Sequence, residues 1–326
     1  MLQENGVMNE MPYYKLYNGV MIPFMGFGVG TVKPEMSLNK YAILYMKEKV
    51  KNVLVPNYKI SNRYPVRRDM LKTKKIAGVI DYAVDICGCR LFDTARAYQK
   101  SEYYLGNAIK PYVQNDRDDF FIITKVTNQA QATHGVRECY EESLKELQME
   151  YVDLLMLHWP QTDTFVEAWK ELENIYFEGK CKAIGVCNCN IKHLEMLMKN
   201  CDVIPMVNEI ECHPLLQQND VIEFCSKNNI QVIAHTPTGR MDKRIIDGLK
   251  DIAEMHNVSV ADIIMCWHYK RGIIPIPNSI NTRHLKDNFS AISKTNLTDD
   301  EMESVKKLNC DVRIWPDPDN CDFSVL

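Results

Sequence analysis

Short apolar runs alternate along the chain with longer segments whose apolar residues recur at helical spacing. The run 120–124 precedes a segment in which one helical face carries Val136, Tyr140, Leu144 and Leu147. Comparable runs, each followed by a segment of helical spacing, lie at residues 152–158, 182–186, 204–208, 231–235 and 272–277. Apolar runs of this length predict buried strands, and regular alternation of strand and helix predicts a parallel sheet.

The N-terminal third adds a hairpin and two strands to this pattern. Asn18–Gly19 lies between two short apolar stretches, which is the strongest short signal for a β-hairpin. A glycine-rich run at 24–31 and the pair Leu91–Phe92 predict two further strands. Eight strands, nearly all followed by helices, predict an α/β protein with a single (β/α)8 (TIM) barrel domain over residues 1–326. A doubly wound open sheet is the alternative, but it predicts phosphate-binding glycines at an early helix, which the 24–31 run does not provide.

Residues 33–75 interrupt the alternation and carry twelve lysines and arginines against three acidic residues. Part of the segment, residues 36–55, has helix-like spacing, and Pro56 and Pro65 break it. We interpret it as a basic insertion in the loop between the first barrel strand and the first helix. Two interpretations of its role stay open, a binding module for a polyanion or acidic partner and a solvated loop, of which the second is simpler and favoured.

Composition argues against several classes of protein. The chain is 46% hydrophobic and 25% charged with a net charge of −4, which argues against a nucleic-acid binder. No apolar run approaches about 18 residues and the N-terminus does not resemble a signal peptide, so we expect no membrane segment and a cytoplasmic location. The twelve cysteines include two C-x-C pairs rather than zinc-type C-x-x-C spacing, which favours reduced thiols and no metal site. No feature indicates an obligate protein partner.

Four side chains suited to proton transfer stand at or just beyond the ends of three predicted strands: Asp93, Tyr98, Lys125 and His158. A parallel barrel gathers the carboxyl ends of its strands on one rim, so these side chains should converge. A tyrosine of pKa ~10 becomes a better proton donor when a cation lowers that value, and a carboxylate can orient the cation. Each residue alone is more often a helix cap or a solvated side chain, whereas the four in this order indicate an active site.

Five motifs together resemble the aldo-keto reductase family in order and spacing: Asp93-Thr-Ala with Tyr98, Ile123-Thr-Lys125, Leu157-His-Trp-Pro160, Gly185-Val-Cys-Asn188 and Val207-Asn-Glu-Ile-Glu-Cys-His-Pro214. The resemblance runs from about Tyr14 to Asp317 and is interrupted by the basic insertion. It implies a (β/α)8 barrel closed at its bottom by an N-terminal hairpin. It also implies reduction of a small-molecule aldehyde or ketone to an alcohol, with NADP(H) or NAD(H) as the cofactor.

The resemblance assigns a role to each of the four polar residues. Tyr98 would donate the proton that the carbonyl oxygen gains, and Lys125 would lower the pKa of Tyr98. Asp93 would anchor Lys125 beside the cofactor, and His158 would orient the carbonyl oxygen. The substrate pocket would be lined by His158, Trp159, Val32 and Thr127.

Further residues would contact the cofactor by the same resemblance: Gly30, Thr31, Lys33, Asn188, Glu209, His235, Asn278, Ser279, His284 and Asn288. Four of them depart from the family pattern. Glu209 replaces a carboxamide-binding glutamine, and an ionised glutamate can only accept hydrogen bonds. His235 replaces a stacking tyrosine. Asn278 and His284 replace a lysine and an arginine, which weakens the expected recognition of a 2′-phosphate, although Arg283 is adjacent.

A second hypothesis places the chain in another functional class. An aldo-keto-reductase-like protein could bind a nucleotide or a partner with little or no turnover. The complete set of catalytic residues favours a working reductase, whereas the altered cofactor positions favour this alternative.

Overall fold

The computed structural model describes residues 11–30, 66–161 and 163–321. Its strands are β1 (Tyr13–Lys15), β2 (Met21–Pro23), β3 (Phe27–Gly28), β4 (Leu91–Asp93), β5 (Phe121–Val126), β6 (Val152–Leu157), β7 (Cys181–Cys187), β8 (Val207–Glu211), β9 (Gln231–His235) and β10 (Ile274–Ile276). Strands β1 and β2 form an antiparallel hairpin, and β3 to β10 form one parallel sheet in chain order.

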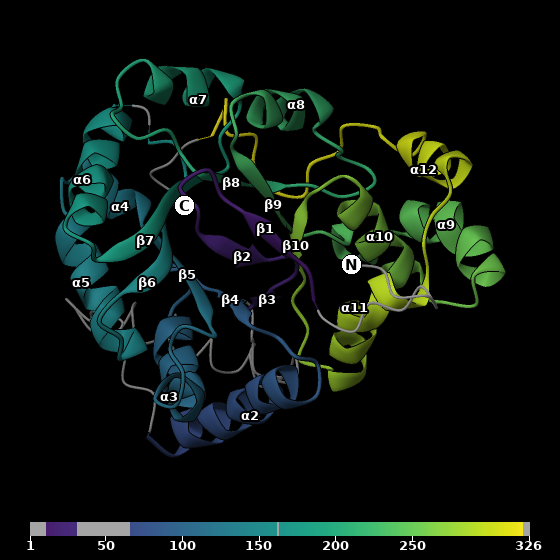
Figure 1. The fold of residues 1–326 in the computed structure, drawn as a ribbon, viewed down its shortest axis with the longest axis horizontal. Helices are drawn as coiled ribbons and strands as arrows, with labels where there is room; N and C mark the ends of the chain where they lie inside the picture. The colour runs from purple at the N-terminus through teal and green to yellow at the C-terminus, as the bar shows by residue number, and fades with distance from the viewer. Residues whose placement is uncertain (1–10, 31–65, 162, 322–326) are drawn as a thin grey trace, which may run out of the picture.

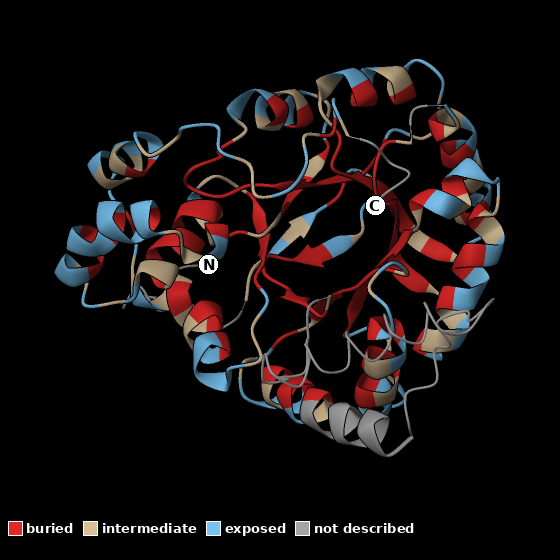
Figure 2. Ribbon diagram, turned by 180° about the vertical axis from the view of Figure 1, so that it is seen from behind, coloured by how far each residue is buried: buried red, intermediate tan, exposed pale blue. Residues whose placement is uncertain are grey.

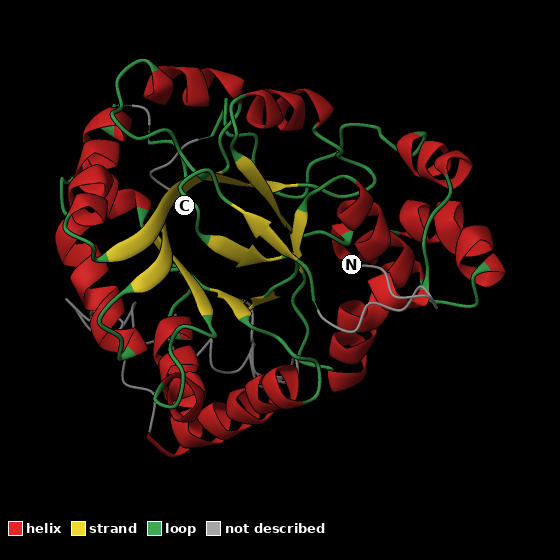
Figure 3. Cartoon of the chain, viewed as in Figure 1, coloured by secondary structure: helices red, strands yellow, loops and turns green. Residues whose placement is uncertain are grey.

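Helices surround this sheet and connect most of its successive strands (Figure 3). They are α2 (Val66–Asp85), α3 (Ser101–Val113), α4 (Asn128–Ala132), α5 (Val136–Leu147), α6 (Phe165–Phe177), α7 (Ile191–Met198), α8 (Asn219–Lys227), α9 (Lys243–Met255), α10 (Val260–Lys270), α11 (Thr282–Lys294) and α12 (Asp299–Lys306), with a 3₁₀ turn η1 (Gly239–Met241). In Figure 1, α9 and α12 lie outside α10, at the periphery of the ring.

Hydrogen bonds between the first and last strands close the sheet into a barrel. The backbone nitrogen of Gly26 donates to the carbonyl oxygen of Pro275 at 3.2 Å, and that of Gly28 donates to Pro277 at 3.1 Å. Gly26 is needed at this seam, because a Cβ there would lie 2.0 Å from the side chain of Leu91. The predicted (β/α)8 barrel is therefore confirmed (Figure 1).

The hairpin β1–β2 closes the bottom of the barrel. The hydroxyl of Tyr17 donates to the carbonyl oxygen of Ile204 at 2.5 Å, and Asn18 Nδ2 donates to that of Lys182 at 3.0 Å. Ile204 precedes β8 and Lys182 lies near the start of β7, so both contacts are at the amino ends of the strands. The carboxyl ends of the strands, where barrels carry their active sites, form the opposite rim.

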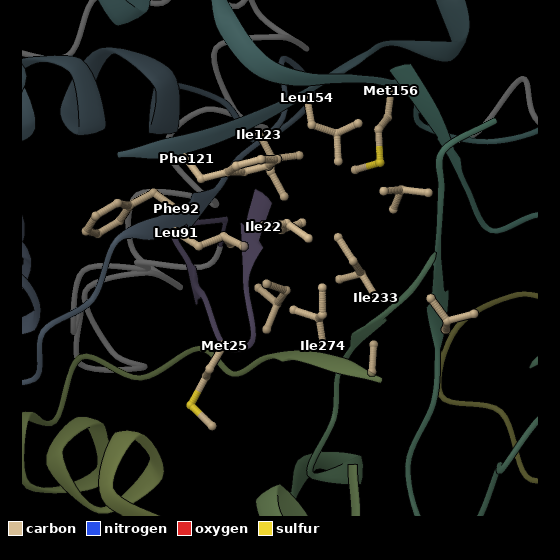
Figure 4. Close-up of a cluster of buried hydrophobic side chains, with 14 of the residues drawn as sticks. Ile22, Met25, Leu91, Phe92, Phe121, Ile123, Leu154, Met156, Ile233 and Ile274 are labelled. Atoms are coloured by element: carbon tan, nitrogen blue, oxygen red, sulfur yellow. The ribbon is translucent and has the colours of Figure 1, made fainter. Parts of the chain in front are cut away.

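Apolar side chains from several strands fill the barrel interior (Figure 4). Leu91, Ile123, Leu154 and Ile233 are fully buried there, and Ile22 reaches the same cluster from the hairpin. Figure 2 shows that buried residues follow the strands and the inner sides of the helices, while the outer helix faces are exposed. This packed interior holds the strand ends, and hence the residues on the rim, in fixed positions.

One strand lies three residues further along the chain than its apolar run predicts. We expected a strand at 204–208, whereas β8 covers Val207–Glu211. The run begins with Ile204, which is 36% exposed, and the strand includes Glu209 and Glu211, which are 1% and 2% exposed. A search for apolar runs does not recognise buried glutamates as strand residues. The groups that interact with these two carboxylates lie on other elements, so the local sequence does not indicate their burial.

The described part of the proposed insertion is helical. Residues 66–75 form the first half of α2, which continues to Asp85, so they belong to the helix layer. The remainder of the insertion, residues 33–65, lies outside the described residues. Within the described part of the chain, no helix is long and apolar enough to cross a membrane.

Candidate active site

The four polar residues predicted to form the site lie together at the carboxyl ends of β4, β5 and β6. Asp93 ends β4, and Lys125 is the next-to-last residue of the neighbouring β5. His158 directly follows β6, and its backbone nitrogen donates to the carbonyl oxygen of Val126 at 3.2 Å. Tyr98 lies between β4 and α3. The parallel register of adjacent strands is what brings these side chains to one rim.

Lys125 is the fully buried centre of this group. Its Nζ forms an ion pair with Asp93, donates to the carbonyl oxygen of Thr94 at 3.2 Å, and lies 3.2 Å from Glu209 Oε2. Burial alone would lower the pKa of Lys125, but the negative charge of Asp93, to which Glu209 adds when it is ionised, outweighs burial and holds the pKa well above its usual range. Lys125 is therefore a permanent buried cation.

Tyr98 packs over Lys125. Lys125 Nζ lies 5.5 Å from the centre of the phenol ring. Desolvation raises the pKa of Tyr98, Lys125 lowers it, and Asp93 and Glu209 raise it again. The lysine acts in the predicted direction, but the net shift is upward. Gly30 allows this packing, since a Cβ at that position would lie 2.5 Å from the Tyr98 ring.

His158 also packs against Tyr98. The two rings meet edge to face with their centres 5.3 Å apart. Burial lowers the pKa of His158 to about 3, and the charge of Lys125 adds to this effect. His158 is therefore a neutral imidazole at physiological pH, able to donate one hydrogen bond and accept another.

Glu209 is a second carboxyl group in contact with Lys125. Burial raises its pKa to about 8, and Asp93 adds to this shift while Lys125 opposes it. Although Oε2 lies 3.2 Å from Lys125 Nζ, it is buried and makes no hydrogen bond to any described residue. The raised pKa favours the protonated form of this carboxyl group, which can donate as well as accept, as the amide of a glutamine does.

Asn188 and His235 lie beside Glu209 at the ends of β7 and β9. The backbone nitrogen of Asn188 donates to the carbonyl oxygen of Glu209 at 2.7 Å. His235 Nε2 lies 2.9 Å from Asn188 Oδ1. Asn188 has a φ of 59°, a left-handed conformation that asparagine tolerates better than most residues.

The predicted adenosine-binding residues gather in a second group, around the connection between β10 and α11. Asn278 follows β10, and its Cβ would be 3.7 Å from a Cβ at Gly28 of β3. Ser279 Oγ accepts a hydrogen bond from the backbone nitrogen of Asn281 at 3.1 Å. His284 is exposed on the first turn of α11, and Asn288 is buried one turn further on.

Of the four predicted pocket-lining residues, Trp159 and Thr127 are described in addition to His158. Trp159 is 7% exposed and follows His158. Thr127 caps α4, where its Oγ1 accepts a hydrogen bond from the backbone nitrogen of Ala130 at 3.1 Å. Val32 and the predicted cofactor residues Thr31 and Lys33 lie outside the described residues.

Motif matching on the sequence missed three contacts of this site. Cys187 is 2% exposed and pairs with Glu209 across β7 and β8, with its Sγ 3.2 Å from Asn188 Nδ2. Thr94 contributes only its carbonyl oxygen, which no motif reveals. Trp315 reaches the hydroxyl of Thr236, next to His235. Cys187 could have been found from its place beside Asn188, but it was hidden among twelve cysteines.

Comparison with known proteins agrees with this geometry. The sequence model of the aldo/keto reductase family matches residues 66–310. Among characterised sequences, the chain is 40% identical over 241 residues to the uncharacterised oxidoreductase YtbE of Bacillus subtilis (strain 168), covering 72% of this chain and 85% of that protein. It is 38% identical over 238 residues to the glyoxal reductase of the same organism, covering 72% and 84%.

A solved structure gives the same result. The silkworm (Bombyx mori) aldo-keto reductase AKR2E5, complexed with NADPH, matches with a TM-score of 0.75 and 26% identity. The match covers 93% of this chain and 89% of that one. The chain is thus a barrel oxidoreductase that uses a nicotinamide cofactor to reduce carbonyl groups. It belongs to the aldo/keto reductase family.

Proposed function

We propose that the chain reduces a 2-oxoaldehyde with NAD(P)H as the hydride source and Tyr98 as the proton donor. The packing of Tyr98 supports this most directly, because its ring centre lies 5.5 Å from the Lys125 ammonium and its ring contacts His158 edge to face. A phenol placed beside a permanent cation and a neutral imidazole is arranged to release a proton to an oxygen nearby.

Four side chains take part in the transfer of that proton. As the carbonyl oxygen gains negative charge, the phenol of Tyr98 transfers its proton to that oxygen, and a phenolate remains. Lys125 stabilises this phenolate, because its charge is buried and screened little by water. Asp93 holds the ammonium in place. Neutral His158 donates an N–H to the carbonyl oxygen and orients it without adding another charge.

Three residues fit the nicotinamide end of the cofactor, which supplies the hydride when bound. Glu209 Oε2 lies 3.2 Å from Lys125 Nζ without hydrogen-bond geometry, which supports a remaining lone pair for a ligand amide. We assign the carboxamide to Asn188 and Glu209. The partly exposed ring of His235 is assigned to stack on the nicotinamide.

The remaining predicted residues are proposed for the rest of the cofactor: Gly30, Thr31 and Lys33 at the end of the first barrel strand, and Asn278, Ser279, His284 and Asn288 at the adenosine end. Since Asn278 and His284 replace two cations, we propose that the preference for NADPH over NADH is weaker than in relatives that retain both.

The substrate class comes from the relatives. A protein 38% identical to this chain is named a glyoxal reductase, and glyoxal is the smallest 2-oxoaldehyde. We assign the lining of its pocket to His158, Trp159, Thr127 and Val32. We also propose a reducing, cytoplasmic location, which the high number of cysteines, most of them buried among apolar residues, supports.

The proposal is tested by following NADPH oxidation with glyoxal, methylglyoxal, a simple aldehyde and a ketone. We expect kcat/KM to be highest for the two 2-oxoaldehydes. A simple aldehyde that is reduced as efficiently would contradict the substrate class, and no NADPH oxidation with any of the four would contradict the whole proposal.

A further inference from the structure

A chain of hydrogen bonds links the C-terminal segment to the active site. Trp315 Nε1 donates to Thr236 Oγ1 at 2.9 Å, and that hydroxyl lies 3.2 Å from His235 Nδ1. His235 Nε2 lies 2.9 Å from Asn188 Oδ1, and Asn188 Nδ2 donates to the carbonyl oxygen of His158 at 3.0 Å. Five residues from four separate segments of the chain are thereby joined into one line of consecutive hydrogen bonds.

The chemistry at both ends gives this line a single direction. An indole N–H can only donate, so Thr236 Oγ1 accepts from Trp315, and the hydroxyl proton remains available for His235 Nδ1. At the other end, the carbonyl oxygen of His158 can only accept, so Asn188 turns its amino group towards His158 and its Oδ1 towards His235. Burial lowers the pKa of His235 to about 3, so its ring is neutral. The Asn188 end requires the ring proton on Nε2, and the contact with Thr236 and Trp315 favours the same tautomer by supplying a hydroxyl proton to Nδ1.

Thr236, in the middle of this chain of hydrogen bonds, has an uncommon backbone conformation. Thr236 has a φ of 53°, which is a true outlier for a β-branched residue and costs on the order of 1–3 kcal/mol. This conformation accompanies a hydroxyl placed between Trp315 and His235. A strained residue that the surrounding structure maintains is a common feature of functional sites.

The barrel anchors Trp315 firmly. The carboxylate of Glu211, the last residue of β8, accepts the backbone N–H groups of Ile314 at 2.7 Å and Trp315 at 3.0 Å. The guanidinium of Arg240 lies 5.2 Å from the Trp315 ring centre. Glu211 also pairs with His235 in the register of β8 and β9. The end of the chain is therefore tied to the strand pair that carries the site.

We propose that Trp315 is a positioning residue for Asn188, acting through Thr236 and His235 so that Asn188 offers only an acceptor to the cofactor. Both amino hydrogens of Asn188 are engaged, one by the His158 carbonyl and one by Cys187 Sγ at 3.2 Å. Oδ1 accepts from His235 and keeps one lone pair open. An open acceptor matches the amino group of a carboxamide and rejects a group without N–H.

This inference rests on the proposed role of Asn188 at the nicotinamide carboxamide. The probes are NADP⁺ and its 3-acetylpyridine analogue, in which a methyl ketone replaces the carboxamide and removes its N–H donors. Binding of each is measured by fluorescence titration. Loss of one neutral hydrogen bond of about 1 kcal/mol changes a dissociation constant about fivefold. Wild type should therefore bind NADP⁺ more tightly than the analogue by at least that factor.

Two substitutions break the line and one keeps it. Trp315→Phe keeps an aromatic ring under Arg240 but has no N–H, and Thr236→Val keeps the shape of threonine without its hydroxyl. Both should lower the preference for NADP⁺ over the analogue about fivefold. Thr236→Ser retains the hydroxyl and should keep the wild-type preference. If Trp315→Phe and Thr236→Val keep the wild-type preference as well, the inference is wrong.

Nitrogen NMR of ¹⁵N-histidine-labelled protein without cofactor tests the line separately from the proposed function. His235 should show a protonated Nε2 and an unprotonated Nδ1 in wild type, and a mixture of tautomers in Trp315→Phe. A single Nε2–H tautomer in both proteins would reduce Trp315 to a structural role and overturn the inference. If the tautomers change as expected but wild type does not distinguish the two dinucleotides, the assignment of Asn188 in the proposed function fails, and this inference fails with it.

Discussion

Replacing Glu209 by glutamine should change how the stability of the protein depends on pH. Glu209 is fully surrounded by protein, and its carboxyl group faces Asp93, Lys125, Tyr98 and Cys187. Burial, with Asp93, raises its pKa from an ordinary value of 4.5 to about 8. Glutamine has nearly the same shape and does not titrate, so the substitution removes this proton-binding group with little change in packing.

The sign follows from the raised pKa. Between pH 4.5 and about 8, the folded protein retains the Glu209 proton while the unfolded chain releases it. The folded state is therefore favoured at low pH and loses that advantage as pH rises towards 8. A difference of about 3.5 pH units at about 1.36 kcal/mol per unit sets an upper limit of roughly 5 kcal/mol. Because Asp93 and Lys125 take part in the same titration, the measured change in the free energy of unfolding should be smaller than this limit.

Urea unfolding at a series of pH values from 5 to 9 measures this effect. The free energy of unfolding of the wild type should fall relative to that of Glu209→Gln as pH rises from about 5 to 8, and the difference should be constant above that. Asp93 is present in both proteins, so much of its own titration cancels in the comparison. Two curves that run parallel from pH 5 to 9 would show that Glu209 is ionised throughout and would refute the reasoning.

Two further predictions concern the cofactor and the basic segment. Asn278→Lys should raise the preference for NADPH over NADH by about tenfold or more, since a charge-assisted hydrogen bond to phosphate contributes about 1.5–3 kcal/mol. An unchanged ratio of the two dissociation constants would mean that position 278 does not approach the 2′-phosphate. Residues 31–65 follow Gly30, which lies against Tyr98, so we predict that their basic groups attract anionic substrates to this rim. Added salt should then lower kcat/KM more for a carboxylated aldehyde than for a neutral one. Deletion of residues 36–62 should abolish this difference. If kcat/KM for the two aldehydes falls equally with salt in the full-length protein, a solvated loop is favoured.

The features that the sequence predicted well depend on local patterns. The strand β9 was predicted with its observed bounds, because the apolar residues 232–234 are uninterrupted and polar residues stand on either side of them. Lys125 and His158 follow long apolar runs, so their positions at strand ends could be inferred without knowing the fold. Once the strands form a barrel in chain order, their convergence follows from the topology.

The features that were missed depend on contacts between distant segments. Strand β8 was misplaced because its buried Glu209 and Glu211 are stabilised by Lys125 and by the backbone of residues 314–315, which the local sequence does not reveal. Trp315 lies 79 residues from Thr236 along the chain, and no spacing rule connects them. The net rise in the pKa of Tyr98 likewise depends on how deeply the phenol is surrounded by other elements.

The most direct test of the proposed mechanism is a single-turnover measurement on Tyr98→Phe. Enzyme with bound NADPH is mixed rapidly with methylglyoxal, and oxidation of the cofactor is followed by absorbance. Tyr98→Phe should bind NADPH with nearly wild-type affinity, because the hydroxyl is assigned to the substrate oxygen. Its oxidation rate should fall by ~10²–10⁴-fold, the usual contribution of a positioned acid. A rate close to that of the wild type would show that another group donates the proton and would contradict the account.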